Sequence, residues 1–176
     1  MFKLRFAVAD IPKWSADYSY DGSDARFLSE VRLAVRERGY LTATEFRDIC
    51  YWKTPRSQAW CRQNSADDIR VLTKAALATR DEALKMDLLR RLRGVDWPTA
   101  STLLHFCDLR PYPILDYRAL WSLGYARPPR YTMPFWLGYV AYVRELVRRS
   151  GHPIRIVDRA LWQYSKARQR SARAAA

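Results

Sequence analysis

Apolar residues along the chain recur mostly three or four positions apart, which is the spacing of a helix with one buried face. The stripe after Ser23, at Phe27, Val31 and Val35, is followed by Gly39, a residue type that commonly ends helices. This pattern predicts a helix that begins near Ser23 and ends at Gly39.

Capping residues mark the starts of further helices. Thr42-Ala-Thr-Glu45 has the form of a capping box, in which the hydroxyl and the carboxylate each bind a backbone N–H group of the first turn. Similar starts are expected at Ser65-Ala-Asp-Asp68, at Thr79-Arg-Asp-Glu82, and at Thr132, two positions before Pro134. Together these signals predict a series of helices through the middle of the chain.

Two expectations concern the later helices. The helix that opens at Thr79-Arg-Asp-Glu82 is expected to bury Leu84, Leu88 and Leu92. A last helix is expected over about 157–168, with Asp158 as its N-cap, before it frays into a tail rich in Arg and Ala.

Only the N-terminus has the period of a strand. Apolar positions from Phe2 to Val8 alternate with charged or small ones, and no partner strand follows. We therefore expect an extended arm laid on the core, followed by a loop over residues 10–22. The chain as a whole predicts an all-α fold, a compact multi-helix domain spanning residues 1–176.

The charge of the chain narrows the class of partner. The 176 residues include 31 Lys and Arg against 18 Asp and Glu, a formal net charge of +13. A small domain this basic favours a polyanion, with nucleic acid first and an anionic membrane surface second. The basic residues include Arg90, Arg91 and Arg93 and a basic tail at 166–176.

Other sequence features bear on membrane insertion, secretion and metal binding. The chain has no apolar run of the roughly 18 residues that a membrane span needs. Charges interrupt the apolar residues of Met1-Phe-Lys-Leu-Arg-Phe, so we expect no secretory signal. We expect a monomer without a membrane partner, either cytoplasmic and associated with a bacterial nucleoid, or nuclear. Three cysteines and two histidines are too few for a typical zinc or iron–sulfur site, so no metal or other cofactor is expected.

One stretch, Leu92-Arg-Gly-Val-Asp-Trp-Pro-Thr-Ala100, carries the information about chemistry. A helix is expected to end at Leu92, a tight turn follows at Gly94, and a new helix begins near Pro98. Such a turn presents backbone N–H groups and a helix N-terminus to one point in space, an arrangement that binds a phosphate without reading base sequence.

This stretch resembles the helix-hairpin-helix motif, written LPGVGxxTA in its DNA glycosylase form. The likeness continues in Leu109-Arg-Pro-Tyr-Pro-Ile-Leu-Asp116, where an apolar pair precedes an Asp that opens the next helix. Asp116 falls 18 positions after Pro98, a spacing that also fits the family. Over roughly residues 80–125 the chain therefore resembles the helix-hairpin-helix (HhH-GPD) DNA glycosylase superfamily, the base-excision repair enzymes.

The resemblance implies a set of site residues. Double-stranded DNA would be held by the hairpin at 92–100, and Asp116 would be the catalytic carboxylate. The hairpin residues expected to bind DNA are Arg93, Gly94, Val95, Asp96, Trp97 and Thr99.

The chain departs from the family pattern at three points. Asp96 replaces the second glycine of the motif and brings a negative charge beside the phosphate site. Pro98 stands where bifunctional members carry a lysine that forms a Schiff base, and proline cannot act as a nucleophile. The C-terminal cysteines that hold iron–sulfur clusters in some members are absent. These departures imply a monofunctional glycosylase, without AP-lyase activity or a cofactor.

The expected reaction is hydrolysis of an N-glycosidic bond. Cleavage builds positive charge on the sugar, and a carboxylate near that charge stabilises the transition state. The base must first leave the stack and enter a pocket. Its expected walls are Tyr51, Trp52, Lys53 and Trp60, and aromatic walls favour a cationic, alkylated purine.

Plainer interpretations remain open for several of these residues. Asp116 is also a suitable N-cap for the helix that follows, and Trp97 could cover the core instead of the DNA backbone. Trp52 could be a core residue, and His105 is expected to be a core or rim histidine. As alternatives to the enzyme, we consider a non-catalytic helix-hairpin-helix DNA-binding protein and an RNA-associated helical protein.

Overall fold

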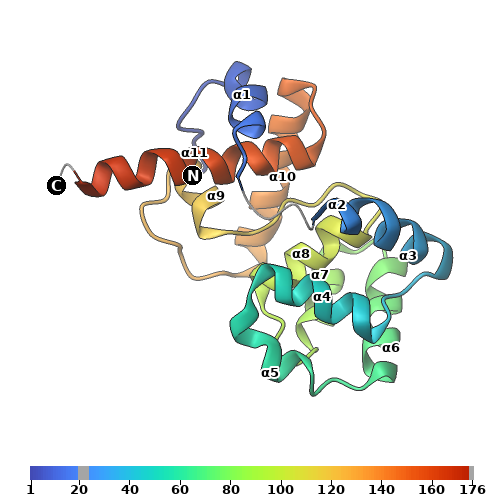
Figure 1. Cartoon of the computed structure of the whole chain (residues 1–176). Helices are drawn as coiled ribbons and strands as arrows, with labels where there is room; N and C mark the ends of the chain where they lie inside the picture. The colour runs from blue at the N-terminus through green and yellow to red at the C-terminus, as the bar shows by residue number, and fades with distance from the viewer. Residues whose placement is uncertain (20–23, 175–176) are drawn as a thin grey trace. The chain divides into compact units, whose positions relative to one another are not determined.

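A computed structural model of the chain describes residues 1–19 and 24–174, with side chains described as far as residue 169 (Figure 1). The described residues form helices joined by turns and contain no strand, which confirms the expected all-α fold. The chain divides into two compact units. We call Asp21–Tyr112 the central unit, and Met1–Tyr20 together with Pro113–Ala176 the terminal unit. The interpretation of residues 1–176 as a single domain stays a prediction.

The central unit is built around one buried helix. All residues of α8 (Trp97–Cys107) except Pro98 are buried. The other elements of the unit are α2 (Asp24–Arg26), the π-helical turn η2 (Phe27–Val31), α3 (Arg32–Arg38), α4 (Ala43–Lys53), the 3-10 turn η3 (Pro55–Ser57), α5 (Gln58–Cys61), α6 (Ala66–Ala78) and α7 (Glu82–Arg90). Helices α3, α4 and α7 contact α8, so that its apolar residues form the centre of this unit (Figure 1).

The local signals for helix ends are confirmed in the central unit. Gly39 ends α3 with a positive φ of 84°. Thr42 and Glu45 form the expected capping box at the start of α4. The hydroxyl of Ser65 accepts the N–H of Asp68 at the start of α6.

The expected start of α7 was wrong, and its expected buried face was wrong in part, because Leu92 is buried as expected but Leu84 is not. Its N-cap is Asp81, whose carboxylate accepts two backbone N–H groups, and not Thr79. Leu84, which was expected inside, is 42% exposed, whereas Lys85 is 1% exposed. The Lys85 ammonium forms a buried ion pair with Asp108 and donates to the carbonyl of Ala76 over 2.9 Å. Because a buried lysine occupies the inner face, the hydrophobic pattern alone pointed to the wrong register.

The terminal unit has α11 (Ile154–Ala174) at its centre. The short α1 (Ile11–Ala16) and α9 (Tyr117–Ser122) pack on it, and α10 (Met133–Ser150) precedes it in the chain (Figure 1). Thr132 caps α10 as expected. A 3-10 turn, η1 (Val8–Asp10), leads into α1.

Three expectations about the terminal unit were wrong. Residues 11–16 form a helix instead of a loop, because packing on α11 stabilises a helix too short to form alone; residues 20–22 of that expected loop lie outside the described residues. Helix α11 begins at Ile154, so that Asp158 lies inside the helix and is not its N-cap. The helix also continues past Arg168 to Ala174, where a frayed tail was expected.

The extended N-terminal arm is confirmed. The N–H groups of Lys3 and Arg5 donate to the carbonyls of Leu123 and Ser122 over 3.0 and 2.9 Å. Phe2 packs among aromatic rings of the terminal unit, and exposure alternates along the arm from Met1 to Asp10. The arm therefore belongs to the terminal unit without forming a sheet.

Candidate functional site

The sequence motif at 92–100 folds as a helix, a tight turn and a second helix within the central unit. Helix α7 ends at Arg90 and α8 begins at Trp97, each within two residues of the expected position. Gly94, at the bend, has a φ of 77°. A Cβ at this position would lie 2.7 Å from the Sγ atom of Cys61 and 2.9 Å from its backbone nitrogen. Both the backbone angle and the contact with Cys61 therefore require glycine.

The side chain of Asn64 holds the turn through hydrogen bonds that the sequence did not predict. Its side-chain oxygen accepts the N–H of Arg93 over 2.8 Å, and its amide nitrogen donates to the Arg93 carbonyl over 2.9 Å. Asn64 is 7% exposed, so these bonds are shielded from water. An asparagine directly before the N-cap Ser65 gives no local signal of this contact.

The negative charge of Asp96 is offset by a neighbouring arginine. The Arg90 guanidinium lies 3.1 Å from a carboxylate oxygen of Asp96 and 4.2 Å from the centre of the Trp97 ring. Trp97 itself is 7% exposed, so it covers the core. The departure from the family motif at Asp96 is thus accompanied by a local cation that compensates for it.

The N-terminus of α8 has no side-chain cap. Asp96 occupies the N-cap position, yet its carboxylate accepts no hydrogen bond from the described first turn of α8. N–H groups at a helix start carry a partial positive charge and bind anions. Among the hairpin residues Arg93 and Asp96 are exposed and Gly94 is partly exposed, while Val95 and Thr99 are buried and support the turn.

Two thiols lie beneath the turn. Cys61 and Cys50 are both fully buried, and a hydrogen bond from Cys50 lowers the pKa of Cys61 to about 6. Burial raises the pKa of Cys50 well above its usual value. Cys50 and Cys107 are core residues, as expected.

Asp116 lies in the terminal unit, at the start of α9. Its carboxylate accepts the N–H of Arg118 over 2.8 Å, so the interpretation as an N-cap is confirmed. The side chain is partly exposed. The capping bond does not test catalysis, so the catalytic role of Asp116 stays a prediction.

Buried side chains from two other helices hold the segment that leads to Asp116. The hydroxyl of Tyr139 on α10 donates to the Ile114 carbonyl over 2.8 Å, and the carboxylate of Asp158 on α11 accepts the Ile114 N–H over 3.0 Å. Asp158 also pairs with Arg155 at 2.7 Å, and both side chains are at most a tenth exposed. Burial, together with the charges of Asp158 and Asp116, raises the pKa of Tyr139 well above its usual value, so this hydroxyl keeps its proton.

Of the four residues expected to form the base pocket, Tyr51 and Trp60 are exposed, and the role of all four as pocket walls stays a prediction. Tyr51 is 58% exposed and lines a shallow hollow of about 410 Å³ with Arg47 and Arg62, while Trp60, 59% exposed, does not line it. The Trp52 ring packs 5.1 Å from that of Phe106, as a core residue would. Lys53 is the last residue of α4.

The surroundings of His105 are those of a structural residue. His105 is 2% exposed and its Nδ1 lies 2.6 Å from the Tyr112 carbonyl, consistent with a core histidine. Within the described ranges, no three His, Cys, Asp or Glu side chains are grouped to hold a metal ion. Among the described helices, none has both the length and the apolar character needed to cross a membrane.

Comparison of the chain with protein-family models, curated proteins and solved structures finds no match. The resemblance to helix-hairpin-helix DNA glycosylases therefore stays a prediction, carried by the motif residues.

Proposed function

We propose that this protein is a monofunctional DNA glycosylase, which hydrolyses the N-glycosidic bond of a damaged or modified base extruded from duplex DNA. One observation carries the proposal. The motif that resembles the glycosylase hairpin has a helix–turn–helix geometry with an obligatory glycine and an uncapped helix N-terminus. This geometry supports binding of a DNA phosphate, and the chain also provides a carboxylate at the family spacing.

The hairpin would bind the DNA backbone. The partial positive charge of the α8 N-terminus and the exposed Arg93 favour a phosphate oxygen, while the pairing of Asp96 with Arg90 limits repulsion. None of these groups reads a base edge, so the hairpin would bind duplexes of different sequence with similar affinity.

Asp116 would act on the sugar. As the bond between C1′ and the base nitrogen breaks, the base leaves with the bonding electron pair and the sugar becomes positively charged. The carboxylate would stabilise this charge and orient a water, whose oxygen bonds to C1′ and whose proton is released. Pro98 provides no amine, so the product would be an abasic site in an intact strand.

The decisive experiment compares the protein with its Asp116→Asn variant on duplexes that carry a panel of alkylated, deaminated and oxidised bases. Asparagine also caps helices, so the variant should fold and bind DNA. We expect alkali-labile sites with the parent protein, and a loss of rate of about 100-fold or more in the variant. Thr132→Ala, which removes a different N-cap from the same unit, is the matched control and should keep its activity.

A second candidate function is a non-catalytic DNA-binding protein. It is favoured by the hydrogen bond from Arg118 to Asp116, which accounts for this carboxylate without any reaction. If no duplex of the panel yields an abasic site while all are bound with a steep salt dependence, this function replaces the enzyme.

A further inference from the structure

The positive charge of the chain is concentrated in the terminal unit, although the hairpin belongs to the central unit. The terminal unit contains 15 Lys and Arg against five Asp and Glu, a net charge of +10. The central unit contains 16 against 13, a net charge of +3. Phosphate binding by the hairpin therefore does not explain the net charge of the terminal unit, which is most of the net charge of the chain.

Few carboxylates are present to neutralise these cations. The five acidic residues of the terminal unit are Asp10, Asp17, Asp116, Glu145 and Asp158. Asp158 forms an ion pair with Arg155, and Glu145 forms one with Arg148. From residue 159 to the last residue the sequence contains five Lys and Arg and no Asp or Glu. All charged residues in the C-terminal half of α11 are therefore basic.

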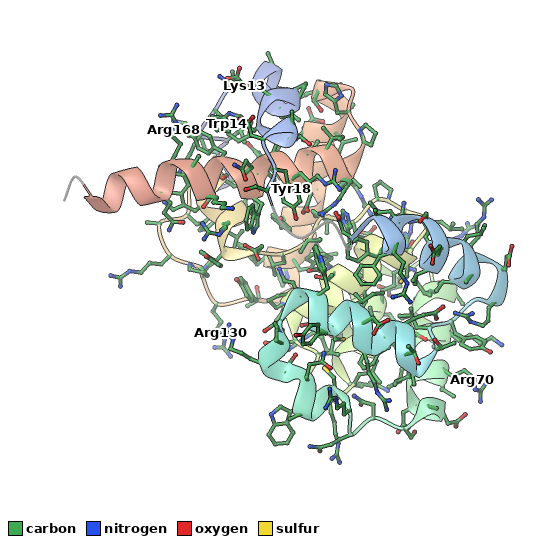
Figure 2. All side chains as sticks on the ribbon, in the orientation of Figure 1. Lys13, Trp14, Tyr18, Arg70, Arg130 and Arg168 are labelled. Atoms are coloured by element: carbon green, nitrogen blue, oxygen red, sulfur yellow. The ribbon has the colours of Figure 1, made fainter. Side chains whose placement is uncertain are left out.

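Two exposed cations from different helices meet at one aromatic ring. The Lys13 ammonium on α1 and the Arg168 guanidinium on α11 each lie 5.7 Å from the centre of the Trp14 ring (Figure 2). The ring is itself held by edge-on contacts with Tyr164 at 5.1 Å and Phe6 at 6.3 Å between ring centres. We call Lys13, Trp14 and Arg168 the α1–α11 surface.

This arrangement prepares cations for an anionic partner. A cation held over an aromatic face contributes about 0.5–1 kcal/mol at an exposed site. It also restricts a long side chain, so that less conformational entropy is lost when its polar end binds a phosphate. Lys166 is oriented similarly, because its ammonium donates to the hydroxyl and the carbonyl of Ser19 over 2.7 and 3.2 Å.

The character of the surface favours nucleic acid over a membrane. A helix that lies on a membrane buries large apolar side chains in the lipid. Among the described residues of the terminal unit, the large hydrophobic side chains that are exposed are Met1, Tyr117 and Leu137, and none belongs to α1 or α11. Charge without an apolar anchor is typical of contacts with a phosphate backbone.

We propose that the α1–α11 surface is a second DNA contact, which binds the phosphate backbone of the duplex independently of the hairpin. The choice of DNA as the polyanion rests on the proposed function, whereas the phosphate chemistry does not. Each cation that neutralises one phosphate adds about 0.9 to the slope of log affinity against log salt concentration.

The test uses the full chain and an undamaged, labelled duplex, with affinity measured between about 50 and 200 mM salt. The double variant Lys13→Gln/Arg168→Gln should lower the slope by about 1.8. The control is Arg70→Gln/Arg148→Gln, which removes the same charge from two exposed arginines paired with Asp67 and Glu145. The control should leave the slope unchanged, and thermal melts establish that both variants are folded.

Three outcomes would overturn the proposal: equal slopes in the two double variants, a loss confined to a single-stranded oligonucleotide, or a loss confined to vesicles of phosphatidylserine and phosphatidylcholine. A loss on both forms supports it, because both present phosphates; the expected loss in slope is about 1.4 on the single strand against about 1.8 on the duplex. Because this measurement needs no base release, failure of the Asp116→Asn experiment and failure of this one are separate results.

Discussion

The hydroxyl of Tyr139 donates a hydrogen bond of 2.8 Å to the carbonyl of Ile114, two positions before Asp116. Asp158 accepts the N–H of the same residue over 3.0 Å. Both backbone polar groups of Ile114 are therefore held by buried side chains from helices α10 and α11. The position of Asp116 is set by these contacts as well as by the helix that it caps.

Tyr139→Phe tests whether this positioning matters. The variant keeps the ring and leaves the Ile114 carbonyl without this donor, at a cost of about 1–3 kcal/mol in the free energy of unfolding. If Asp116 is catalytic, base release under single-turnover conditions at saturating protein should slow by about 5- to 30-fold with unchanged DNA affinity. Tyr142→Phe is the matched control, because its hydroxyl holds the Leu4 N–H at the arm instead. Parallel losses in both variants would contradict the positioning role.

Asp158→Asn should be more damaging to stability. The substitution leaves the Arg155 guanidinium, which is 8% exposed, without its carboxylate. Removal of one partner from a buried ion pair typically costs about 3–5 kcal/mol. Urea unfolding measures the change, and Arg155→Met in the same chain should restore part of it. A change below about 1 kcal/mol would mean that the pair is effectively solvated.

Two glycines with similar backbone angles should respond differently to alanine. At Gly39, with a φ of 84°, a Cβ would meet nothing within 4 Å, so that only the cost of positive φ applies, about 1–2 kcal/mol. At Gly94 the collision with Cys61 is added, for a total of about 2–5 kcal/mol. Equal losses of stability in the two variants would mean that the turn moves away from α5 without cost.

The capping box at Thr42 should make stability depend on acid. Burial alone would raise the pKa of Glu45, but hydrogen bonds from Thr42 and Arg38 lower it overall, below the usual 4.5. A lowered folded-state pKa stabilises the protein above the usual value, and this contribution is lost as pH falls through the folded-state pKa.

Glu45→Gln, which mimics the protonated acid, should therefore be less stable than the parent at pH about 7, by about 1 kcal/mol, and equally stable below the folded-state pKa. Urea unfolding of both proteins at the two pH values gives the difference. The exposed Glu145→Gln serves as a control and should change little at either pH, since exposed pairs contribute little. A difference in stability between the parent and Glu45→Gln that persists at acidic pH would mean that it comes from packing and not from the charge of Glu45.

The parts of the fold that the sequence predicted correctly depend on contacts between near neighbours. The capping box at Thr42, the N-caps at Ser65 and Asp116, and the positive φ of Gly39 involve residues at most four positions apart. Such interactions are visible in the residue types and their spacing.

The errors involve contacts between residues distant in the sequence. Lys85 is inside because Asp108 is there to pair with it, and α1 is helical because α11 covers it. In the central unit Asn64, and in the terminal unit Tyr139, bind backbone groups 29 and 25 residues away. A single sequence contains no spacing rule for such pairs, and these are the residues that hold the hairpin turn and the approach to Asp116.

The terminal unit combines residues 1–20 with residues 113–176, and this has a consequence for synthesis. On the ribosome, the arm and α1 emerge before the central unit, while the helices that receive them are made only after the whole central unit. At about 5–20 residues per second the interval lasts several seconds. During that time Phe2 lacks Phe135, and Phe6 and Trp14 lack Tyr164, so the nascent chain would expose an aromatic segment that a chaperone could recognise.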